Sequence, residues 1–244
     1  DTGKAIVKVK LRKKSDEDYK KQQEALKDDK QARLFLKVTC QGDDKKHKIA
    51  FVEHFKLICD PHKWANSEFG KLIGKYKSRN NYNICNKTYY DEKAGKRKSK
   101  SVTNLTIVEM TISEIQKKQK AREIFAAGRW QIIPDTLKEV IIGLKLNTND
   151  FFNEEMQDRM FDEYLIKKKR PKIIGYLEGN ETVEDAMYEC AKEWASVGVE
   201  KGKKISKNRI AIGDDSYYKG DGLNKAHITA NQIKQALMNS KKNN

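Results

Sequence analysis

The chain has 244 residues, 37% of them hydrophobic, and carries a formal net charge of +16 at pH 7. The length allows one large domain or two small ones, and no run of about 18 apolar residues exists to form a membrane-spanning helix. The charge attracts polyanions, but the strongest basic runs, at 93–101 and 166–172, lack interleaved aromatic residues, and no zinc-finger or RNA-binding signature occurs. The charge therefore indicates a solvated basic surface or an anionic partner other than nucleic acid.

Residues 1–62 differ from the rest of the chain and are predicted to form a small β-rich region. The segments "AIVKVKL", "RLFLKVTC" and "KIAFVEHF" have the length and the apolar content of strands. The sequence does not begin with Met and opens without an apolar signal segment, which indicates a processed chain or an excised fragment.

Cysteine and histidine give no sign of a metal site. His54, Cys59 and His62 lie close together, but no second pair with metal-ligand spacing follows, so we expect neither zinc nor any other cofactor. The cysteines are Cys40, Cys59, Cys85 and Cys190. Their even number is compatible with disulfides but too small for a disulfide framework, and buried free thiols are predicted.

From residue 63 to residue 244 the pattern is mainly helical. The segment 64–77 places apolar side chains at helical spacing, namely Phe69, Leu72, Ile73 and Tyr76. Residues 80–104 are polar and rich in turn formers, which predicts a loop or a small β-hairpin. Thr111 and Glu114 have the spacing of a capping box, and the helix that follows continues one face with Ile112, Ile115 and Gln119.

Further helices are expected toward the C-terminus. Gly128 breaks the chain before a helix whose predicted N-cap is Asp135 and whose buried stripe is Leu137, Val140, Ile141 and Leu144. The segment 153–169 has an acidic start and a basic end, which complement the helix dipole, and Pro171 marks its stop. Its predicted buried residues are Met156, Met160, Phe161, Tyr164 and Leu165.

The last two helices are predicted at 181–197 and 228–238. The first carries an apolar stripe made of Val183, Met187, Cys190, Ala191 and Trp194. The second opens with another capping box, Thr229 and Gln232. The predicted fold class is therefore mainly α, in the α+β sense that a small β-lobe accompanies the helices.

One segment, "AAGRWQIIPDTL" (126–137), has residues typical of a saccharide site. Gly128 allows a tight turn, Trp130 offers a flat apolar face, and Gln131 offers both a hydrogen-bond donor and an acceptor. Sugar rings present C–H faces and hydroxyl edges, which such a combination suits. Ordinary packing at a helix start explains the same residues.

This segment resembles the "GRYQ-x-x-P-x-T" pattern of phage endolysins and bacterial muramidases with a lysozyme-like fold. Four further segments resemble the family's in the same order along the chain: "LTIVEMTISEIQKKQ", "QDRMFDEYLIKKKRPKIIGYLEG", "AKEWASVGV" and "SYYKGDGLNKAHITANQIKQAL". The resemblance covers about residues 66–238. It implies a lysozyme-like helical domain with a small β-lobe at 63–244, preceded by a β-rich region at 1–62 of the kind found before secreted muramidase toxins.

The family's pattern "(I/L)-x-x-x-E-S-x-x-x-Y-N-x-x-N" corresponds to residues 73–86, with Lys77 in place of the glutamate. In the family that glutamate is the general acid, which protonates the leaving glycosidic oxygen. A lysine offers no acid of matched pKa and sets a positive charge beside a positive transition state. Three explanations stay open: an engineered change that silences a toxic hydrolase, a natural loss that leaves a wall-binding protein, or an alignment error in which Glu68 or the pair Asp91–Glu92 holds the acid.

The resemblance implies a peptidoglycan-cleaving glycoside hydrolase, an N-acetylmuramidase, inactive in this copy because of Lys77. Such a lysin or antibacterial toxin would be secreted or delivered to the periplasm and cell wall, where glycan strands are its partners and an immunity protein would neutralise it. A non-catalytic peptidoglycan-binding module and a lytic transglycosylase are the alternatives. Lys77, Asp91 and Glu92 are the candidate catalytic positions. The candidate substrate-binding residues are Ser78, Tyr82, Asn83, Asn86, Trp130, Gln131, Tyr217, Tyr218 and Asn224.

Overall fold

The computed structural model describes residues 63–179, 181–221 and 224–242, all within the second of the two units into which the chain divides, Cys59–Asn244. The predicted β-rich region at 1–62, with Cys40 and the His54–Cys59–His62 group, lies outside the described residues. The described part is mainly helical with small antiparallel sheets, as the sequence predicts. Within it, no helix combines the length and the apolar character that crossing a membrane requires.

The elements alternate between helices and short strands. The helices are α2 (Glu68–Ser78), α3 (Ile112–Lys120), α4 (Pro134–Leu144), α5 (Glu154–Arg159), α6 (Pro171–Glu178), α7 (Val183–Glu193) and α8 (Ala230–Lys242). A 3₁₀ turn spans Ile107–Glu109, and a π-helix, Met160–Lys169, continues α5. The strands β1 (Cys85–Asp91), β2 (Lys96–Val102) and β3 (Ala126–Ala127) form a sheet in the order β2-β1-β3. Two small pairs are β4 (Gly198–Val199) with β7 (Asp215–Ser216) and β5 (Lys204–Ile205) with β6 (Arg209–Ile210).

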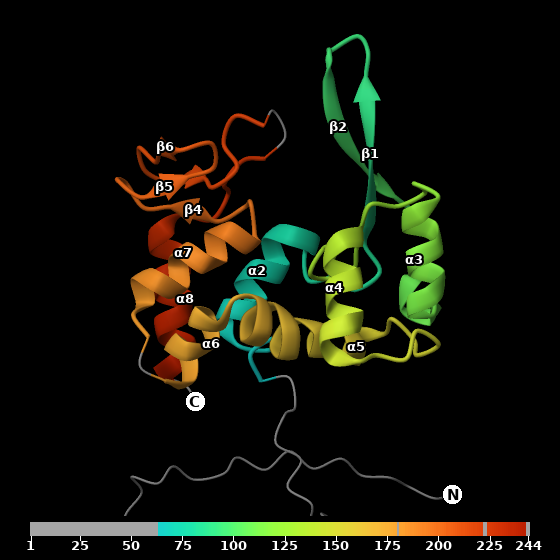
Figure 1. Ribbon diagram of the computed structural model, residues 1–244, viewed down its shortest axis with the longest axis horizontal. Coiled ribbons are helices and arrows are strands. Elements are labelled where there is room, and N and C mark those ends of the chain that lie inside the picture. Colours follow the sequence, from blue (N-terminus) through green and yellow to red (C-terminus); the bar gives the residue numbers. More distant parts are fainter. Residues whose placement is uncertain (1–62, 180, 222–223, 243–244) are drawn as a thin grey trace, which may run out of the picture. The chain divides into compact units, whose positions relative to one another are not determined.

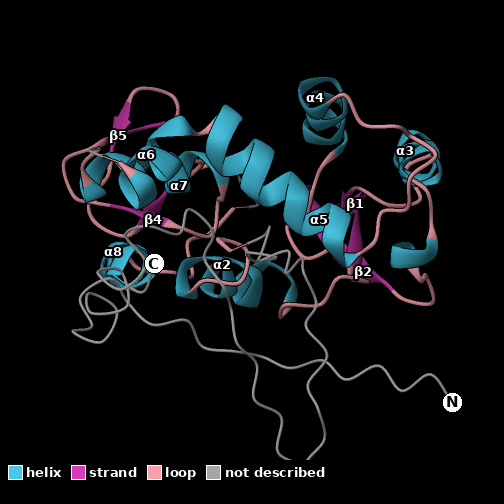
Figure 2. Cartoon of the chain, turned by 90° about the horizontal axis from the view of Figure 1, so that it is seen from below, coloured by secondary structure: helices cyan, strands magenta, loops and turns pink. Residues whose placement is uncertain are grey.

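The domain has two sides that helices join (Figure 1). α3, α4 and the β1–β2 hairpin lie on one side, and α6, α7 and α8 lie with the small strand pairs on the other. α2 lies between the two sides and packs against α8. The helix that starts as α5 and continues as the π-helix runs from one side to the other (Figure 2).

An aromatic cluster forms the middle of the core. Phe69 of α2, Phe161 of the π-helix and Trp194 after α7 meet with ring centroids 5.6 to 5.9 Å apart. Trp130 stacks on Phe161 with a centroid separation of 3.9 Å. All four rings are buried. Because they come from elements of both sides, their packing fixes the two sides relative to each other.

The helix starts follow the predicted chemistry in most places. Thr111 and Glu114 form a complete capping box at α3, and Thr229 and Gln232 exchange the same pair of hydrogen bonds at α8. The prediction that Asp135 is an N-cap is wrong. The N-cap is Ile133, two residues earlier, and Pro134 occupies the first helical position, where its fixed φ and missing N–H are tolerated.

Pro171 marks the stop of the long helix as predicted, because that helix ends at Lys169. Pro171 also begins α6, at the first helical position after Arg170. Tyr76 has the helical spacing of the buried residues of α2 but is 36% exposed, with the Lys75 ammonium 5.7 Å from its ring centroid. Phe69 and Ile73, which share that spacing, are fully buried.

The long helix is predicted correctly in place but not in type. Met156, Met160, Phe161 and Leu165 are buried as expected. From Met160 onward the turns are wider, and the last one closes with a bond from the Arg170 N–H to the Leu165 carbonyl, five residues back. Such widened turns occur often at functional sites.

The first described residues are tied firmly to the core. The backbone N–H groups of Trp64 and Ala65 donate to the two carboxylate oxygens of Asp162, at 3.1 and 2.8 Å. The Trp64 indole donates to Glu178 at 2.9 Å, and Arg129 donates to the Ala65 carbonyl at 2.9 Å. Because these bonds reach three separate elements, residues 64–65 belong to the interior of the fold.

Residues 80–104 form the hairpin that the sequence allowed. β1 and β2 pair antiparallel from Cys85 opposite Val102 to Asp91 opposite Lys96. Beyond its base the hairpin stands clear of the helices (Figure 1). Cys85 and Cys190 are buried free thiols, which confirms the prediction for these two cysteines.

Candidate functional site

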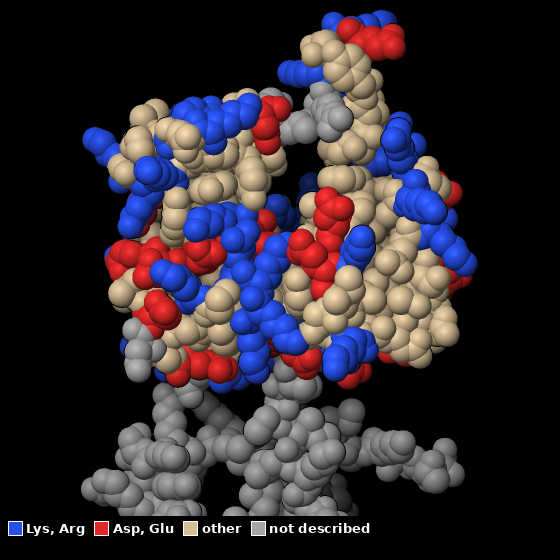
Figure 3. Space-filling view, in the orientation of Figure 1, with Lys and Arg blue, Asp and Glu red and all other residues tan. Residues whose placement is uncertain are grey.

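A cleft of about 600 Å³ lies between the two sides of the domain. Its walls are the C-terminal end of α2, the base of the hairpin, the segment 125–133, the end of α7 and the loop before α8. Figure 3 shows the surface hollowed between the hairpin side and the side with the small strand pairs, with basic side chains along its border. The volume is within the range of ligand sites, and apolar and polar groups share the lining.

Lys77 is on the wall of this cleft, in the last turn of α2. Its side chain is half-buried, and among the described residues no hydrogen bond or ion pair engages its ammonium group. Burial lowers the pKa of Lys77 to about 8, and the Glu193 carboxylate opposes this shift in part. The desolvated ammonium group is therefore held at an energetic cost.

This cost predicts an unusual dependence of stability on pH. The pKa of Lys77 is about 8 in the folded protein and ordinarily 10.5, so between these values the unfolded chain binds more protons and stability rises with pH. We expect the free energy of unfolding to gain up to about 3 kcal/mol from this group across that window. Urea unfolding of the wild-type protein and of Lys77→Met at pH 7 to 10 measures it: the wild type should gain relative to the variant, and parallel curves would contradict the prediction.

Gln131 and Asn86 form a fixed amide pair on the opposite wall. The Asn86 side-chain NH₂ donates to the Gln131 carbonyl oxygen at 2.9 Å, while Gln131 donates to the backbone carbonyls of Gly128 and Ile84 at 2.9 and 3.3 Å. Asn86 accepts in turn from the Ala126 N–H. Gln131 adopts a φ of 53°, uncommon for a residue with a side chain. Both amides are therefore preorganised at the cleft.

Gly128 makes this arrangement possible. Its φ is 75°, and a Cβ there would lie 2.1 Å from the Gln157 side-chain oxygen and 3.1 Å from Phe152. Gln157 is fully buried and uses that oxygen to accept from the Arg129 N–H. We expect Gly128→Ala to lower the free energy of unfolding by about 2 kcal/mol or more, because the left-handed conformation and the clash add. Chemical denaturation measures this, and the exposed Gly95, with a φ of 58° and nothing near its Cβ position, is the control in which conformation acts alone.

Three more predicted residues border the cleft. Tyr218 donates to the Lys192 backbone carbonyl at 2.6 Å, and burial together with the Glu193 carboxylate raises its pKa. Asn224 borders the cleft from the C-terminal loop and bonds the Asp221 carboxylate. Trp130 is 2% exposed, and its indole N–H donates to Asp158 at 3.2 Å. Trp130 therefore belongs mainly to the core, although it also borders the cleft.

Four predicted binding residues do not line the cleft. Ser78 is buried and donates to the Gly74 carbonyl. The Tyr82 hydroxyl donates to Asp158 and accepts from Arg129, at 2.8 Å each. Burial and the bond to Asp158 raise the pKa of Tyr82 to about 12. The Asn83 side chain accepts from a backbone N–H, that of Val108. Tyr217 packs edge-on against two other tyrosines. All four side chains therefore make contacts within the protein.

The candidate second carboxylates also lie elsewhere. Asp91 is at the outer end of β1, where Lys98 and the Ala94 N–H hold its pKa below the ordinary value. Glu92 is exposed in the turn that follows. Figure 1 shows this tip far above the helices, because the hairpin extends away from the body. Midway along the same hairpin, Thr88 and Ser99 are opposite each other and line the cleft.

Glu193 is the one carboxylate among the described residues that line the cleft. It is the last residue of α7, with 9% of its side chain exposed, and it accepts from Arg170 Nε at 2.9 Å and lies 3.4 Å from Lys169 Nζ. Arg170 also pairs with Glu189 at 3.1 Å. Arg170 lies in the "KKRP" part and Glu193 in the "EWAS" part of two motifs quoted above. The two motifs are separate in sequence, and the fold brings them together.

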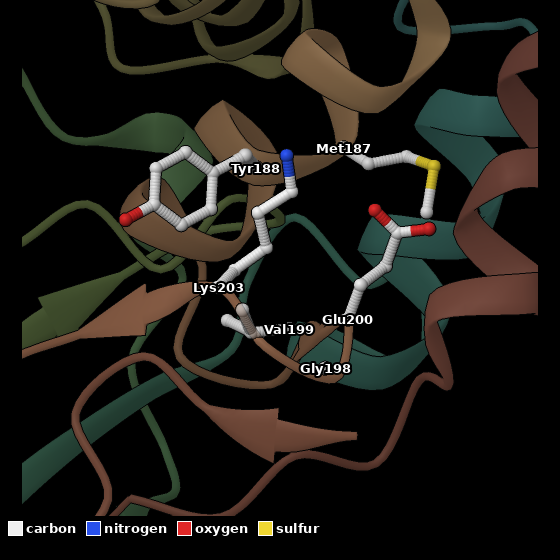
Figure 4. A pocket seen from close by; sticks show the side chains of 6 residues that line it. All are labelled: Met187, Tyr188, Gly198, Val199, Glu200 and Lys203. Carbon is white, nitrogen blue, oxygen red and sulfur yellow. The ribbon is translucent and has the colours of Figure 1, made fainter. Parts of the chain in front are cut away.

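A second, much smaller hollow lies near β4 (Figure 4). Met187, Tyr188, Val199, Glu200 and Lys203 surround it, and its volume is about 10 Å³. That is room for about one water molecule, so this hollow is no substrate site. Within the described part of the chain, no group of three or more His, Cys, Asp or Glu side chains is arranged to hold a metal ion.

Comparison of the chain with family models, with curated proteins and with solved structures finds no match.

Proposed function

We propose that the cleft binds a glycan strand of bacterial peptidoglycan, that the domain has a lysozyme-like fold, and that the chain is an N-acetylmuramidase silenced by Lys77. One observation carries the proposal: Lys77, which occupies the position of the family's general acid, borders the same cleft as Gln131 and Asn86. The sequence resemblance implies roles for Lys77, Asn86 and Gln131 from motifs that are separate along the chain. Their occurrence around one cavity supports that assignment.

The lining suits a sugar polymer. Amide and hydroxyl groups from Asn86, Thr88, Gln131 and Tyr218 can bond hydroxyl edges, and apolar surface such as that of Phe125 can contact C–H faces. Phe125 is 38% exposed although it is large and apolar. Exposed aromatic surface inside a cleft is more typical of a binding wall than of a core.

The surroundings of position 77 suit a general acid. Burial lowers the pKa of a lysine there to about 8. The same loss of hydration raises the pKa of a carboxyl group, because in both cases the charged form is the one that burial disfavours. A glutamate at this position would therefore keep its proton closer to neutral pH, which a glycosidase acid requires.

The rival assignments of the acid have less support. Glu68, at the start of α2, accepts from Asn239 of α8 and borders a groove between these two helices. Asp91 and Glu92 are at the hairpin tip. A silenced enzyme, whether natural or engineered, therefore explains the lining better than a shifted alignment does. A secreted or periplasmic toxin or lysin, with an immunity protein as its neutralising partner, is the setting that this proposal implies.

The test is to change Lys77 to glutamate and follow the turbidity of purified sacculi. Clearing by the Glu form alone supports the silenced muramidase. Clearing by both forms places the acid elsewhere, and clearing by neither favours a non-catalytic peptidoglycan-binding module. Mass spectrometry of the products separates hydrolysis, which leaves a reducing sugar, from lytic transglycosylation, which leaves an anhydro sugar.

A further inference from the structure

Glu193 is placed where a helix disfavours a carboxylate. It is the last residue of α7, and the C-terminal end of a helix carries partial negative charge. Its side chain is also nearly buried, which disfavours the charged form again. The position at the helix end therefore does not explain why residue 193 is acidic.

Two cations from the π-helix end offset these penalties and hold the carboxylate still. Arg170 donates from Nε to one Glu193 oxygen at 2.9 Å, and Lys169 approaches the other at 3.4 Å. Each cation has a second anchor: Arg170 bonds Glu189 and the Lys192 carbonyl, and Lys169 bonds Thr136 and pairs with Glu139. The Glu193 carboxylate is therefore fixed at the cleft by groups that are themselves fixed.

The charge of Glu193 also acts on Lys77 of α2. Among the described residues, the Lys77 ammonium group makes no hydrogen bond or ion pair. Both side chains border the cleft, from different helices. The other titratable groups around Glu193 are Lys169 and Arg170 at the π-helix end, Tyr164 within the π-helix, Tyr218 in the C-terminal loop, and Glu189, Cys190 and Lys192 on α7 itself.

We propose that Glu193 is a positioning residue of the cleft: Arg170 and Lys169 hold its carboxylate at the cleft wall, where its charge favours the protonated form of the side chain at position 77. In this chain its negative charge partly offsets the effect of burial on the Lys77 ammonium group. With a glutamate at position 77, it would be the like-charged neighbour that keeps that glutamate protonated until the proton passes to the glycosidic oxygen. This second part rests on the proposed function, and the first does not.

The direct test measures how readily Lys77 reacts with an amine-modifying reagent in the folded protein, since only the neutral amine reacts. Mass spectrometry of the Lys77 peptide gives the rate from pH 6 to 9 in the wild type, Glu193→Gln and Glu189→Gln. Removing the Glu193 charge should lower the Lys77 pKa, and each unit of lowering raises the neutral fraction at pH 6.5 about tenfold. Glu189→Gln is the matched control, because it removes a carboxylate from the same Arg170 but leaves Glu193 in place. Unchanged Lys77 reactivity in Glu193→Gln, or an equal change in both variants, overturns the proposal.

A second variant keeps the test decisive in case Glu193→Gln folds poorly. Glu193→Asp keeps a carboxylate and its negative charge at this position, so the rate at which Lys77 reacts at pH 6.5 should stay near that of the wild type. A change in Glu193→Asp equal to that in Glu193→Gln would refute a role for the Glu193 charge.

An activity measurement tests the second part. In a Lys77→Glu protein that clears sacculi, adding Glu193→Gln should shift the alkaline limb of the rate–pH profile to lower pH, because the general acid then loses its proton more easily. Glu193→Asp, which keeps the charge, should restore part of the profile. An unshifted limb refutes this role. If Lys77→Glu clears nothing, the proposed function fails, while the reactivity of Lys77 still decides whether the Glu193 charge acts on the side chain at position 77.

Discussion

The Lys77→Glu protein is expected to clear sacculi at least several hundred times faster than the wild type. The wild-type ammonium group would lie beside the positive charge that develops on the sugar. At about 4 Å and an effective dielectric constant of about 20, that repulsion is about 4 kcal/mol, nearly a thousandfold in rate. The glutamate removes the repulsion and supplies the proton for the leaving oxygen.

Lys77→Gln is the control for this substitution, because glutamine has the shape of glutamate and no ionising proton. It also relieves the repulsion, so its clearing rate isolates the contribution of acid chemistry. We expect Lys77→Gln to gain only the part of the rate that relief of the repulsion gives and to stay well below the Glu form. The Glu form should lose activity as pH rises through the pKa of its carboxyl group. Equal clearing by Gln and Glu forms would show that charge removal alone matters and that position 77 supplies no proton.

Asp158→Asn is expected to lower the free energy of unfolding by about 3 to 5 kcal/mol. Asp158 is 5% exposed and pairs with Arg129 at 3.2 Å, while the Tyr82 hydroxyl and the Trp130 indole also donate to it. Without its charge, the buried Arg129 guanidinium loses its counter-ion. Because Arg129, Trp130 and Gln131 are consecutive, we also expect the cleft wall to loosen. Urea unfolding monitored by circular dichroism gives the value.

A neighbouring ion pair on the same helix is a matched control. Arg159 and Glu163 pair at 3.0 Å, but their side chains are 40% and 45% exposed. Glu163→Gln should cost no more than about 0.5 kcal/mol, since exposed pairs contribute little. Adding Arg129→Met to Asp158→Asn should recover part of the loss, because no unpaired charge then remains. A small cost for Asp158→Asn, equal to that of Glu163→Gln, would contradict the interpretation.

Local chemistry was sufficient to predict most helices. The capping boxes at Thr111 and Thr229 depend on residues three apart, and the buried stripes depend on spacing within one helix. The hairpin at 80–104 was left undecided because its strands are polar on both faces and lack the alternation that marks a half-buried strand. The widened turns from Met160 have no local signal, since α- and π-helices share the same residue preferences over so short a segment.

The site was harder to predict because polar residues in a turn have two uses. Tyr82 and Asn83 looked like ligand-binding groups, yet they satisfy a buried ion pair and a backbone N–H. Asn86 and Gln131 looked similar and do border the cleft. The difference depends on partners up to 76 residues away, which no local pattern contains. Glu193 was missed for the same reason: its meaning comes from Arg170 and Lys77, on other helices.

The anchoring of residues 64–65 decides how the folded domain would respond to mechanical load. Tension applied through the preceding chain is met first by the Asp162 carboxylate and the Arg129 guanidinium, both in the interior. The load then acts across the π-helix and the core, so that several bonds must shear together. A terminal helix peeled from the surface would instead yield one turn at a time. We therefore expect the domain to resist unfolding when tension is applied at residues 64–65.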